Sequence, residues 1–590
     1  MRPQVDGGRY PAKRAVGDEV MVEADVFADG HDAVAAELLF RFSEDKTWQR
    51  VPMEFRYNDH WVAAFRVEKL GRYQYTVRGW SDPFLTWRRD LVKRRDAGQD
   101  LTIDLQIGAE ILGAEIADYE SAMQIEVPPP RDESTSTYEK MLEVVVEPVR
   151  ARYSSWYECF PRSYGGLRGL IDHLAYVEEL GFNVLYLPPV HPVGITARKG
   201  KNNAVAAQPG DVGSPWAIGS EDGGHKALDP DLGTFDDFHD LVKEAKKRNI
   251  DIALDIAFQC SPDHPYVREH PEWFRWRPDG TVQYAENPPK KYQDIYPFEF
   301  EGEGWKSLWE ELKSVFEFWI GHGVKIFRVD NPHTKPFAFW QWCIAELKKK
   351  HPELILLSEA FTRPRIMHKL AKLGFSQSYT YFTWRNSKAE LTEYFTELTQ
   401  HESREYFRPN LWPNTPDILH EYLQHGGRPA FIVRAVLAAT AAANYGMYGA
   451  AYELMERTPR EPGSEEYLNS EKYEVKRWDL ERADSLKPLI ARLNSIRREN
   501  PALQRDWSLE FHAIDNGQLL AFSKTQGDNE ILVVLNLDVH HPQSGWIDFP
   551  PCTLHDLLSG GHYTWTTQRN YIELSPHTLP AHVFKVTRIA

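Results

Sequence analysis

Four carboxylate residues stand at or just after the ends of short apolar runs. These are Asp255 in 250–260 (IDIALDIAFQC), Asp330 in 325–330 (KIFRVD), Glu359 in 354–359 (LILLSE) and Asp417 in 410–417 (NLWPNTPD). A charged residue at the end of a strand is often only a solvated boundary. Carboxylates on the carboxyl ends of several strands of one barrel, however, would form an active site.

Such a set suits chemistry at an anomeric carbon. One ionised carboxylate attacks the carbon and one protonated carboxyl serves the leaving group, with retention when they are about 5–5.5 Å apart. Arg328 and Asp330 would share one face of a strand, and the guanidinium would keep Asp330 ionised as a nucleophile. Glu359 follows apolar residues, which favour a raised pKa and the acid role. We expect Asp255 to be a structural carboxylate beside them.

The elements that position these residues alternate along the chain. Apolar runs predict strands at 156–160, 183–187, 250–256, 325–329 and 354–358, and helical runs lie between them. One helix is predicted over 235–248, with Thr234 as its N-cap and Asp237 three residues later. Repeated βα units predict a parallel sheet covered by helices. About 350 residues fit a (β/α)8 barrel over 151–505, although the periodicity leaves a doubly wound sheet open.

Other segments differ from this pattern. Residues 1–105 contain alternating runs between turn residues, which predict an N-terminal β-sandwich, and 506–590 predict a second one. Residues 106–150 predict a short helical connecting segment. Within the barrel, the regions near 191–225 and 260–305 are too long for ordinary loops, and long ordered loops are usually functional.

Composition excludes several classes of function. The 590 residues carry a net charge of −17, which argues against binding to a nucleic-acid backbone or an anionic membrane. The chain has 19 Trp, 27 Tyr and 29 Phe, which could fill cores or stack on sugars. The four cysteines lack metal-site spacing, and the N-terminus lacks the apolar region of an export signal. We expect a cytoplasmic protein without metal or organic cofactor.

Three runs carry a family resemblance: 327–336 (FRVDNPHTKP), 358–364 (SEAFTRP) and 414–420 (NTPDILH). They resemble the α-amylase superfamily, glycoside hydrolase family 13. Within it, the chain is similar to bacterial maltosyltransferases of the GlgE type, which use α-maltose 1-phosphate to extend α-1,4-glucans. The resemblance is strong over about 155–480 and weak in the flanks. Supporting runs are 198–203 (RKGKNN), 213–219 (GSPWAIG), 259–265 (QCSPDHP), 287–296 (NPPKKYQDIY), 379–385 (YTYFTWR) and 463–473 (GSEEYLNSEKY).

Two positions depart from the amylases. Gln259 and Cys260 stand where the first amylase motif has Asn-His, and Pro416 replaces the histidine before the third carboxylate. Those histidines normally hold the donor sugar, so starch hydrolysis is disfavoured. Both departures fit the maltosyltransferase branch.

The resemblance implies a role for each matching residue. Asp330 is the expected nucleophile of a β-maltosyl enzyme, Glu359 the acid and base, and Asp417 the transition-state stabiliser. Arg328 supports Asp330. Residues expected to hold the donor are Lys199, Gln259, Asp294, Asn331, Lys472 and Tyr473, and those expected to hold its phosphate are Asn287, Lys290 and Tyr292, together with Asn331.

The resemblance thus implies maltosyl transfer to the non-reducing 4-hydroxyl of an α-glucan, with inorganic phosphate as product. Alternatives are an α-amylase-like hydrolase and a trehalose-forming isomerase. A non-catalytic scaffold would have lost at least one of Asp330, Glu359 and Asp417, and all three are present. Relatives pair two subunits partly through a helical segment that is short in this sequence, and a homodimer is the expectation.

Overall fold

The computed structural model describes residues 1–126 and 135–589. The chain forms two compact units, Met1–Glu147 and Pro148–Ala590, and each is described by itself. Among the described residues, no helix has the length and apolar character needed to cross a bilayer.

The second unit contains a sheet of eight parallel strands, which confirms the predicted barrel. A parallel bridge between Ser378 and Pro409 joins the two end strands, so the sheet closes and the doubly wound alternative is wrong. Around the ring the strands are β10 (Ser154–Glu158), β11 (Val184–Leu187), β12 (Asp251–Ile256), β17 (Ile326–Asp330), β18 (Ile355–Glu359), β19 (Gln377–Ser378), β20 (Asn410–Leu411) and β21 (Asn444–Tyr448).

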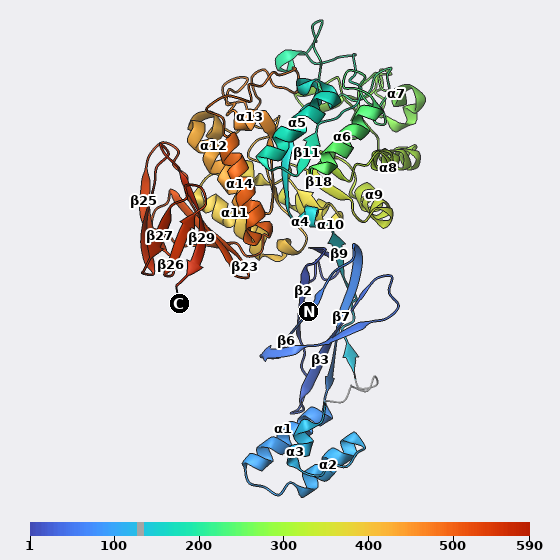
Figure 1. The fold of residues 1–590 in the computed structure, drawn as a ribbon. Coiled ribbons are helices and arrows are strands. Elements are labelled where there is room, and N and C mark those ends of the chain that lie inside the picture. The colour runs from blue at the N-terminus through green and yellow to red at the C-terminus, as the bar shows by residue number, and fades with distance from the viewer. Residues whose placement is uncertain (127–134, 590) are drawn as a thin grey trace. The chain divides into compact units, whose positions relative to one another are not determined.

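Helices surround the strands (Figure 1). They are α5 (Gly166–Leu180), α6 (Phe235–Lys247), α8 (Trp305–Gly321), α9 (Phe337–Lys350), α10 (Pro364–Leu373), α11 (Lys388–Gln400), α12 (Glu421–Ala441) and α14 (Lys487–Glu499). Helix α6 confirms the helix predicted over 235–248. Thr234 and Asp237 cap it reciprocally, each accepting a hydrogen bond from the other's backbone N–H.

Aromatic side chains fill the barrel below the carboxyl ends of its strands. The rings of Tyr379 and Trp412 stack with centroids 5.0 Å apart, and Trp156 and Tyr186 pack against Trp412. Gly446 on β21 leaves the space for Trp412, because a Cβ atom there would lie 2.3 Å from the indole ring. The barrel interior is therefore a packed floor for the site above it.

The long insertions are largely irregular. The first contains one 3-10 turn, Lys201–Asn203. The second holds the short helix α7 (Pro265–Glu269) and two small antiparallel strand pairs, of which only the second is a hairpin. These pair β13 (Gln259–Cys260) with β16 (Tyr296–Pro297), and β14 (Ala285–Asn287) with β15 (Lys290–Tyr292).

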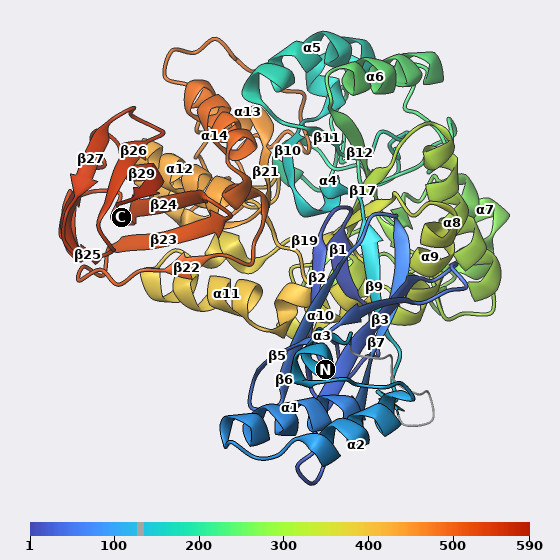
Figure 2. The same cartoon turned by 60° about the horizontal axis from the view of Figure 1, so that its bottom comes forward.

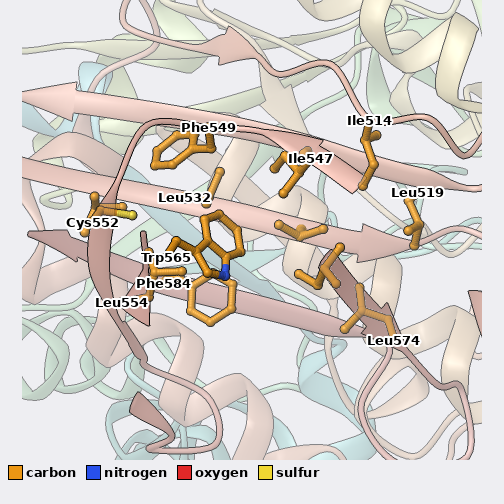
Figure 3. Close-up of a cluster of buried hydrophobic side chains, with 14 residues drawn as sticks. Ile514, Leu519, Leu532, Ile547, Phe549, Cys552, Leu554, Trp565, Leu574 and Phe584 are labelled. Carbon is orange, nitrogen blue, oxygen red and sulfur yellow. The ribbon is translucent and has the colours of Figure 1, made fainter. Parts of the chain in front are cut away.

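The C-terminal residues form the predicted second β-sandwich. One sheet has the order β22 (Glu510–Phe511), β23 (Leu519–Gln526), β24 (Asn529–Asn536), β29 (Ala581–Arg588), β26 (Cys552–Asp556) and β27 (His562–Trp565). The other pairs β25 (Gln543–Asp548) with β28 (Arg569–Leu574). Side chains such as Leu532, Ile547 and Trp565 fill the space between them (Figure 3).

The first unit is a β-sandwich with a helical insertion. One sheet has the order β1 (Ala12–Ala15), β9 (Leu142–Glu147), β7 (Gly71–Ser81), β3 (Val34–Phe42) and β4 (Gln49–Pro52), with β8 (Ser136–Thr137) paired to β7. The other has the order β2 (Glu19–Asp25), β6 (His60–Arg66) and β5 (Glu54–Tyr57).

The helical segment differs from the expected 106–150. Helix α1 (Pro83–Asp96) begins earlier, because Asp82 accepts a hydrogen bond from the Leu85 N–H at 2.9 Å and Pro83 opens the first turn. Helices α2 (Thr102–Leu112) and α3 (Tyr119–Gln124) follow. The chain then returns to the sandwich through β9, which pairs with β7 and β1. The helices are thus an insertion within the sandwich, and 127–134 lie outside the described residues.

Candidate active site

Asp330 and Glu359 are the last residues of β17 and β18, and they occupy paired positions in the parallel ladder. Neighbouring strands lie about 4.7–4.9 Å apart, so this register places the two carboxyl groups side by side at the carboxyl end of the barrel. The structure therefore brings together the two residues that the sequence predicts as nucleophile and acid.

A single guanidinium holds the carboxylates in place. Nη1 of Arg328 donates to Asp255 Oδ2 at 2.8 Å and to Asp330 Oδ1 at 2.9 Å, while Nη2 lies 3.5 Å from Glu359 Oε1. The Arg328 side chain is buried below the cavity that Asp330 and Glu359 line. As expected from strand alternation, Arg328 and Asp330 share one face of β17. A buried charge-assisted hydrogen bond of this kind fixes the position of Asp330.

Asp255 lies beneath the site on β12. Its Oδ2 also accepts hydrogen bonds from the Tyr186 hydroxyl at 2.5 Å and from Trp216 Nε1 at 3.3 Å. Burial raises the pKa of Asp255 to about 7, although the nearby Arg328 charge opposes the rise. Asp255 thus positions Arg328 from below, and its carboxyl group does not line the cavity.

Glu359 has the electrostatic environment of a general acid. Burial raises its pKa to about 7, with Arg328 opposing the rise and the charge of Asp330 adding to it. Oε2 of Glu359 accepts a hydrogen bond from the Asn331 N–H at 3.1 Å. Asn331 adopts the left-handed region, with φ 43° and ψ 51°, directly after β17. This turn directs the Asn331 backbone N–H at Glu359. It also leaves Nδ2 of the Asn331 side chain 3.4 Å from Asp330 Oδ2.

The third carboxylate, Asp417, follows β20 in a tight turn closed by a bridge between Thr415 and Ile418. Lys472 Nζ donates to its Oδ1 at 2.7 Å and lies 4.8 Å from the centroid of the Trp216 ring. Partial burial of Lys472 opposes its charged form, yet the charge of Asp417 raises its pKa above the usual range. The Asp417 side chain is 49% exposed, so it stays open to the cavity.

These groups line a cavity of about 760 Å³. Its walls include nearly all the predicted site residues: Asp330, Glu359 and Asp417, with Lys199, Gln259, Tyr292, Asp294, Asn331, Lys472 and Tyr473. Arg328 lies below the floor. The side chains of Asn287 and Lys290 lie outside the described part of the structure, and only the backbone pairing of these two residues is described.

Asp294 has an unusual environment in this cavity. Only 3% of the residue is exposed, and its Oδ1 has no hydrogen-bond partner among the described residues. Burial raises the pKa of the carboxyl, and the Lys199 charge lowers it by less. An unpartnered buried acceptor on a cavity wall is available to a ligand hydroxyl.

Lys335 belongs to the cavity wall and was missed by sequence reasoning. Its Nζ donates to the Asn331 backbone oxygen at 3.2 Å, and the residue is only 8% exposed. Burial lowers its pKa, while the charges of Asp330 and Glu359 oppose that shift. The sequence places Lys335 in a turn after the strand, and no spacing rule there predicts its return to the site.

A further strand-end carboxylate, Glu158, does not line the cavity and was missed for a different reason. It is the last residue of β10, but the apolar run predicts a strand that continues to 160 and so hides this strand end. The residue is buried, burial raises its pKa well above the usual value, and its Oε2 has no partner among the described residues. The strand-end criterion that identified Asp330 would have identified Glu158 if the boundary had been placed correctly.

Comparisons with known proteins agree with this architecture. Residues 1–155 match the family model described as alpha-1,4-glucan:maltose-1-phosphate maltosyltransferase, domain N/S. Residues 150–313 match alpha amylase, catalytic domain, and 511–586 match GLGE, C-terminal. Among solved structures, the maltogenic alpha-amylase AmyB of Thermotoga neapolitana superposes with a TM-score of 0.59 at 20% identity, covering 75% of this chain and all of that one. That similarity shows the fold alone.

Curated relatives match along almost the whole chain. The alpha-1,4-glucan:maltose-1-phosphate maltosyltransferase of Chlorobaculum tepidum is 51% identical, covering 99% of this chain and 95% of the relative. Proteins of the same name from Methylacidiphilum infernorum and Salinibacter ruber are each 47% identical over the same shares. The chain therefore belongs to the alpha-1,4-glucan:maltose-1-phosphate maltosyltransferase family.

Proposed function

We propose that the protein transfers maltosyl units from α-maltose 1-phosphate to the non-reducing 4-hydroxyl of α-1,4-glucans and releases inorganic phosphate. The observation that carries this proposal is the paired register of Asp330 and Glu359 on one guanidinium, within a cavity lined by the residues that the family resemblance implies. Closely spaced carboxyl groups are typical of retaining enzymes, which work by double displacement.

In the first displacement, an Asp330 oxygen bonds to the anomeric carbon as the bond from that carbon to the phosphate oxygen breaks. Glu359 donates its proton to the departing phosphate oxygen. In the second, the acceptor 4-hydroxyl attacks the β-maltosyl ester, Glu359 takes the hydroxyl proton, and Asp330 leaves as a carboxylate. A group with a pKa of about 7 serves both steps, since both protonation states are available near neutral pH.

Asp417 would stabilise the positive charge that develops on the sugar ring and orient its hydroxyls. Its half-exposed carboxylate faces the cavity, and Lys472 pairs with it through a hydrogen bond at 2.7 Å. We assign donor recognition to the polar groups around it, with the unpartnered Oδ1 of Asp294 accepting from a sugar hydroxyl. The remaining donor-binding residues in this proposal are Lys199, Gln259, Asn331, Lys472 and Tyr473.

The phosphate requires cationic and neutral donors near Glu359. We propose that Asn331 and Tyr292 contribute, together with Asn287 and Lys290 of the adjoining hairpin. Lys335 adds a buried ammonium next to Asp330 and Glu359. It has three donors, of which the Asn331 backbone oxygen takes one, so it can also bind phosphate oxygens.

We also propose a cytoplasmic location and a homodimer. A sugar phosphate does not cross a bilayer unaided, so the enzyme should reside in the compartment where the donor is made. Cell fractionation tests the location. The dimer is implied by the family resemblance, and light scattering on the purified protein tests it.

Incubation with maltoheptaose and α-maltose 1-phosphate tests the function, with controls that omit either substrate. Phosphate release together with products that grow by two glucose units is the expected result, and Asp330→Ala should abolish it. Maltoheptaose that is shortened or redistributed without the phosphate donor would instead establish an amylase-like activity and overturn the proposal.

A further inference from the structure

Two aromatic side chains lie side by side on the outer face of the C-terminal sandwich. Trp546 on β25 and Tyr571 on β28 are directly paired across the strands, with ring centroids 5.7 Å apart and planes inclined by 67°. Their exposed fractions are 46% and 51%. The alternate residues Ile547 and Ile572 belong to the buried core, where Figure 3 shows Ile547, so the outer pair is not needed to fill it.

Polar pairs border the rings on the same face. Ser544 is paired with Glu573 on one side and Asp548 with Arg569 on the other. The Tyr571 hydroxyl donates to Glu573 Oε2 at 2.8 Å. An aromatic surface with hydrogen-bonding groups at both edges matches a sugar, which has apolar C–H faces and a rim of hydroxyls.

The face is held in a fixed conformation. Asp515 Oδ1 accepts a hydrogen bond from the backbone N–H of Trp546 at 2.7 Å, and Asp515 Oδ2 accepts one from Arg569 Nη2 at 2.6 Å. A bridge between Ile514 and Ile547 adds a third contact to the same segment. A preformed surface needs little reordering when it binds a ligand, and this favours affinity.

We propose that the Trp546–Tyr571 face binds α-1,4-glucan at a site separate from the catalytic cavity. The two inclined rings would stack on successive glucosyl units of a chain that curves at each α-1,4 linkage, and the bordering polar groups would bind its hydroxyls. This inference rests on the proposed function, because that function supplies a polymeric acceptor. Figures 1 and 2 both show β25 on the side of the sandwich away from the barrel.

Binding of glucan at this face should favour the reaction with long acceptors only. A glucan held at this face presents its chain ends to the cavity at a raised effective concentration, whereas a short oligosaccharide bound in the cavity gains nothing. The site therefore changes the KM for glycogen and leaves the reaction with maltotetraose unaffected.

The test is the double variant Trp546→Thr/Tyr571→Thr, which keeps β-branched residues on the strands. The matched control is Tyr563→Thr, which removes a 44% exposed aromatic from β27 of the same sandwich. We expect the double variant to lose glycogen affinity about tenfold in affinity electrophoresis and to show a raised KM for glycogen. Its kcat/KM with maltotetraose and its melting temperature should match the wild type. Each single variant should lose part of the affinity.

Unchanged glycogen affinity in the double variant would overturn the inference. So would loss of a dimer in light scattering without loss of glycogen binding, since the face would then be an interface between two copies. Glycogen retention is measured without the phosphate donor. If the wild type releases no phosphate but binds glycogen through this face, the proposed function fails and the binding site stands.

Discussion

Asp330 and Glu359 sit opposite each other on adjacent parallel strands and share the guanidinium of Arg328. The shared cation has unequal effects on the two groups. Asp330 receives a direct bond at 2.9 Å, whereas Glu359 lies 3.5 Å away, and burial raises the Glu359 pKa to about 7. Within a single carboxyl pair, the arginine thus bonds the nucleophile directly and leaves its neighbour with the raised pKa of a proton donor.

This separation predicts the pH dependence of donor use. Glu359 must be protonated to assist phosphate departure, so kcat/KM for α-maltose 1-phosphate should fall as the pH rises through about 7. A profile measured from pH 5 to 9 at saturating acceptor checks this. α-Maltosyl fluoride is the control donor, since fluoride leaves with little acid assistance and should show a weaker alkaline decline. A flat profile for the phosphate donor up to pH 9 would contradict the assigned acid.

Glu359→Gln separates the two displacements. With α-maltose 1-phosphate the variant should lose activity by about 10²–10⁴-fold, because proton transfer to the leaving oxygen is removed. With α-maltosyl fluoride the first step should persist and the second should slow, so a covalent maltosyl adduct accumulates. Intact-protein mass spectrometry detects it as the mass of one maltosyl unit. Asp330→Asn is the control, and an adduct on that variant would show that another residue is the nucleophile.

Lys335 gives a prediction specific to the phosphate. Lys335→Met removes the buried ammonium beside Glu359, and kcat/KM for α-maltose 1-phosphate should fall by about 10–100-fold, as loss of a charge-assisted hydrogen bond implies. With α-maltosyl fluoride the loss should be small, since no phosphate is bound.

The control for this prediction is Lys246→Met, which removes an exposed lysine from α6. Equal losses with both donors would show that Lys335 only balances the carboxylates and does not bind phosphate. Inhibition by inorganic phosphate provides a second measurement and should weaken in Lys335→Met.

The sequence predicts those parts of the site that follow from local residue patterns. Asp330 and Glu359 end apolar strands, so their position at the carboxyl end of a barrel follows from the pattern. Lys335 does not, because its approach depends on the left-handed turn at Asn331, which the sequence does not specify. The polar groups that face Asp294 and Lys472 depend on the path of two long irregular insertions. Hydrophobic periodicity does not predict the path of such segments.

The helical insertion of the first unit shows a related limit. Phe84, Trp87 and Leu91 recur at helical spacing behind Asp82 and are buried in α1, so a local signal was present. Their partners are α2 and α3 rather than a sheet. Trp87 packs on Gly108, where a Cβ atom would lie 2.1 Å from the indole ring. This contact between Trp87 and Gly108 helps to fix where the helices interrupt the sandwich. It joins residues distant in the sequence, so a local sequence pattern does not predict it.

A buried histidine pair, His225 and His264, predicts acid sensitivity of the fold. His264 Nδ1 accepts from the Tyr266 N–H at 3.0 Å, so its Nε2 carries the proton that His225 Nδ1 accepts at 3.0 Å. His225 in turn donates through Nε2 to the Ala257 carbonyl at 3.0 Å. Both rings are therefore neutral. Burial lowers the pKa of His225 to about 4, with smaller opposing influences that include Glu311.

A histidine with a lowered pKa in the folded state stabilises the fold fully above about pH 6.5, and this contribution is lost as the pH falls toward 4. For His225 the loss amounts to about 3 kcal/mol. The raised pKa values of Asp255 and Glu359 act in the opposite direction, so the net pH profile alone does not isolate the histidine. Comparison with the variant His225→Gln isolates the histidine. Its free energy of unfolding should be lower than that of the wild type at pH 8, and this difference should shrink between pH 6.5 and 4. Urea unfolding of both proteins across that pH range measures this stability difference. The control variant is His577→Gln, which changes a histidine at an exposed turn. A difference that stays constant with pH would show that protonation of His225 does not couple to unfolding.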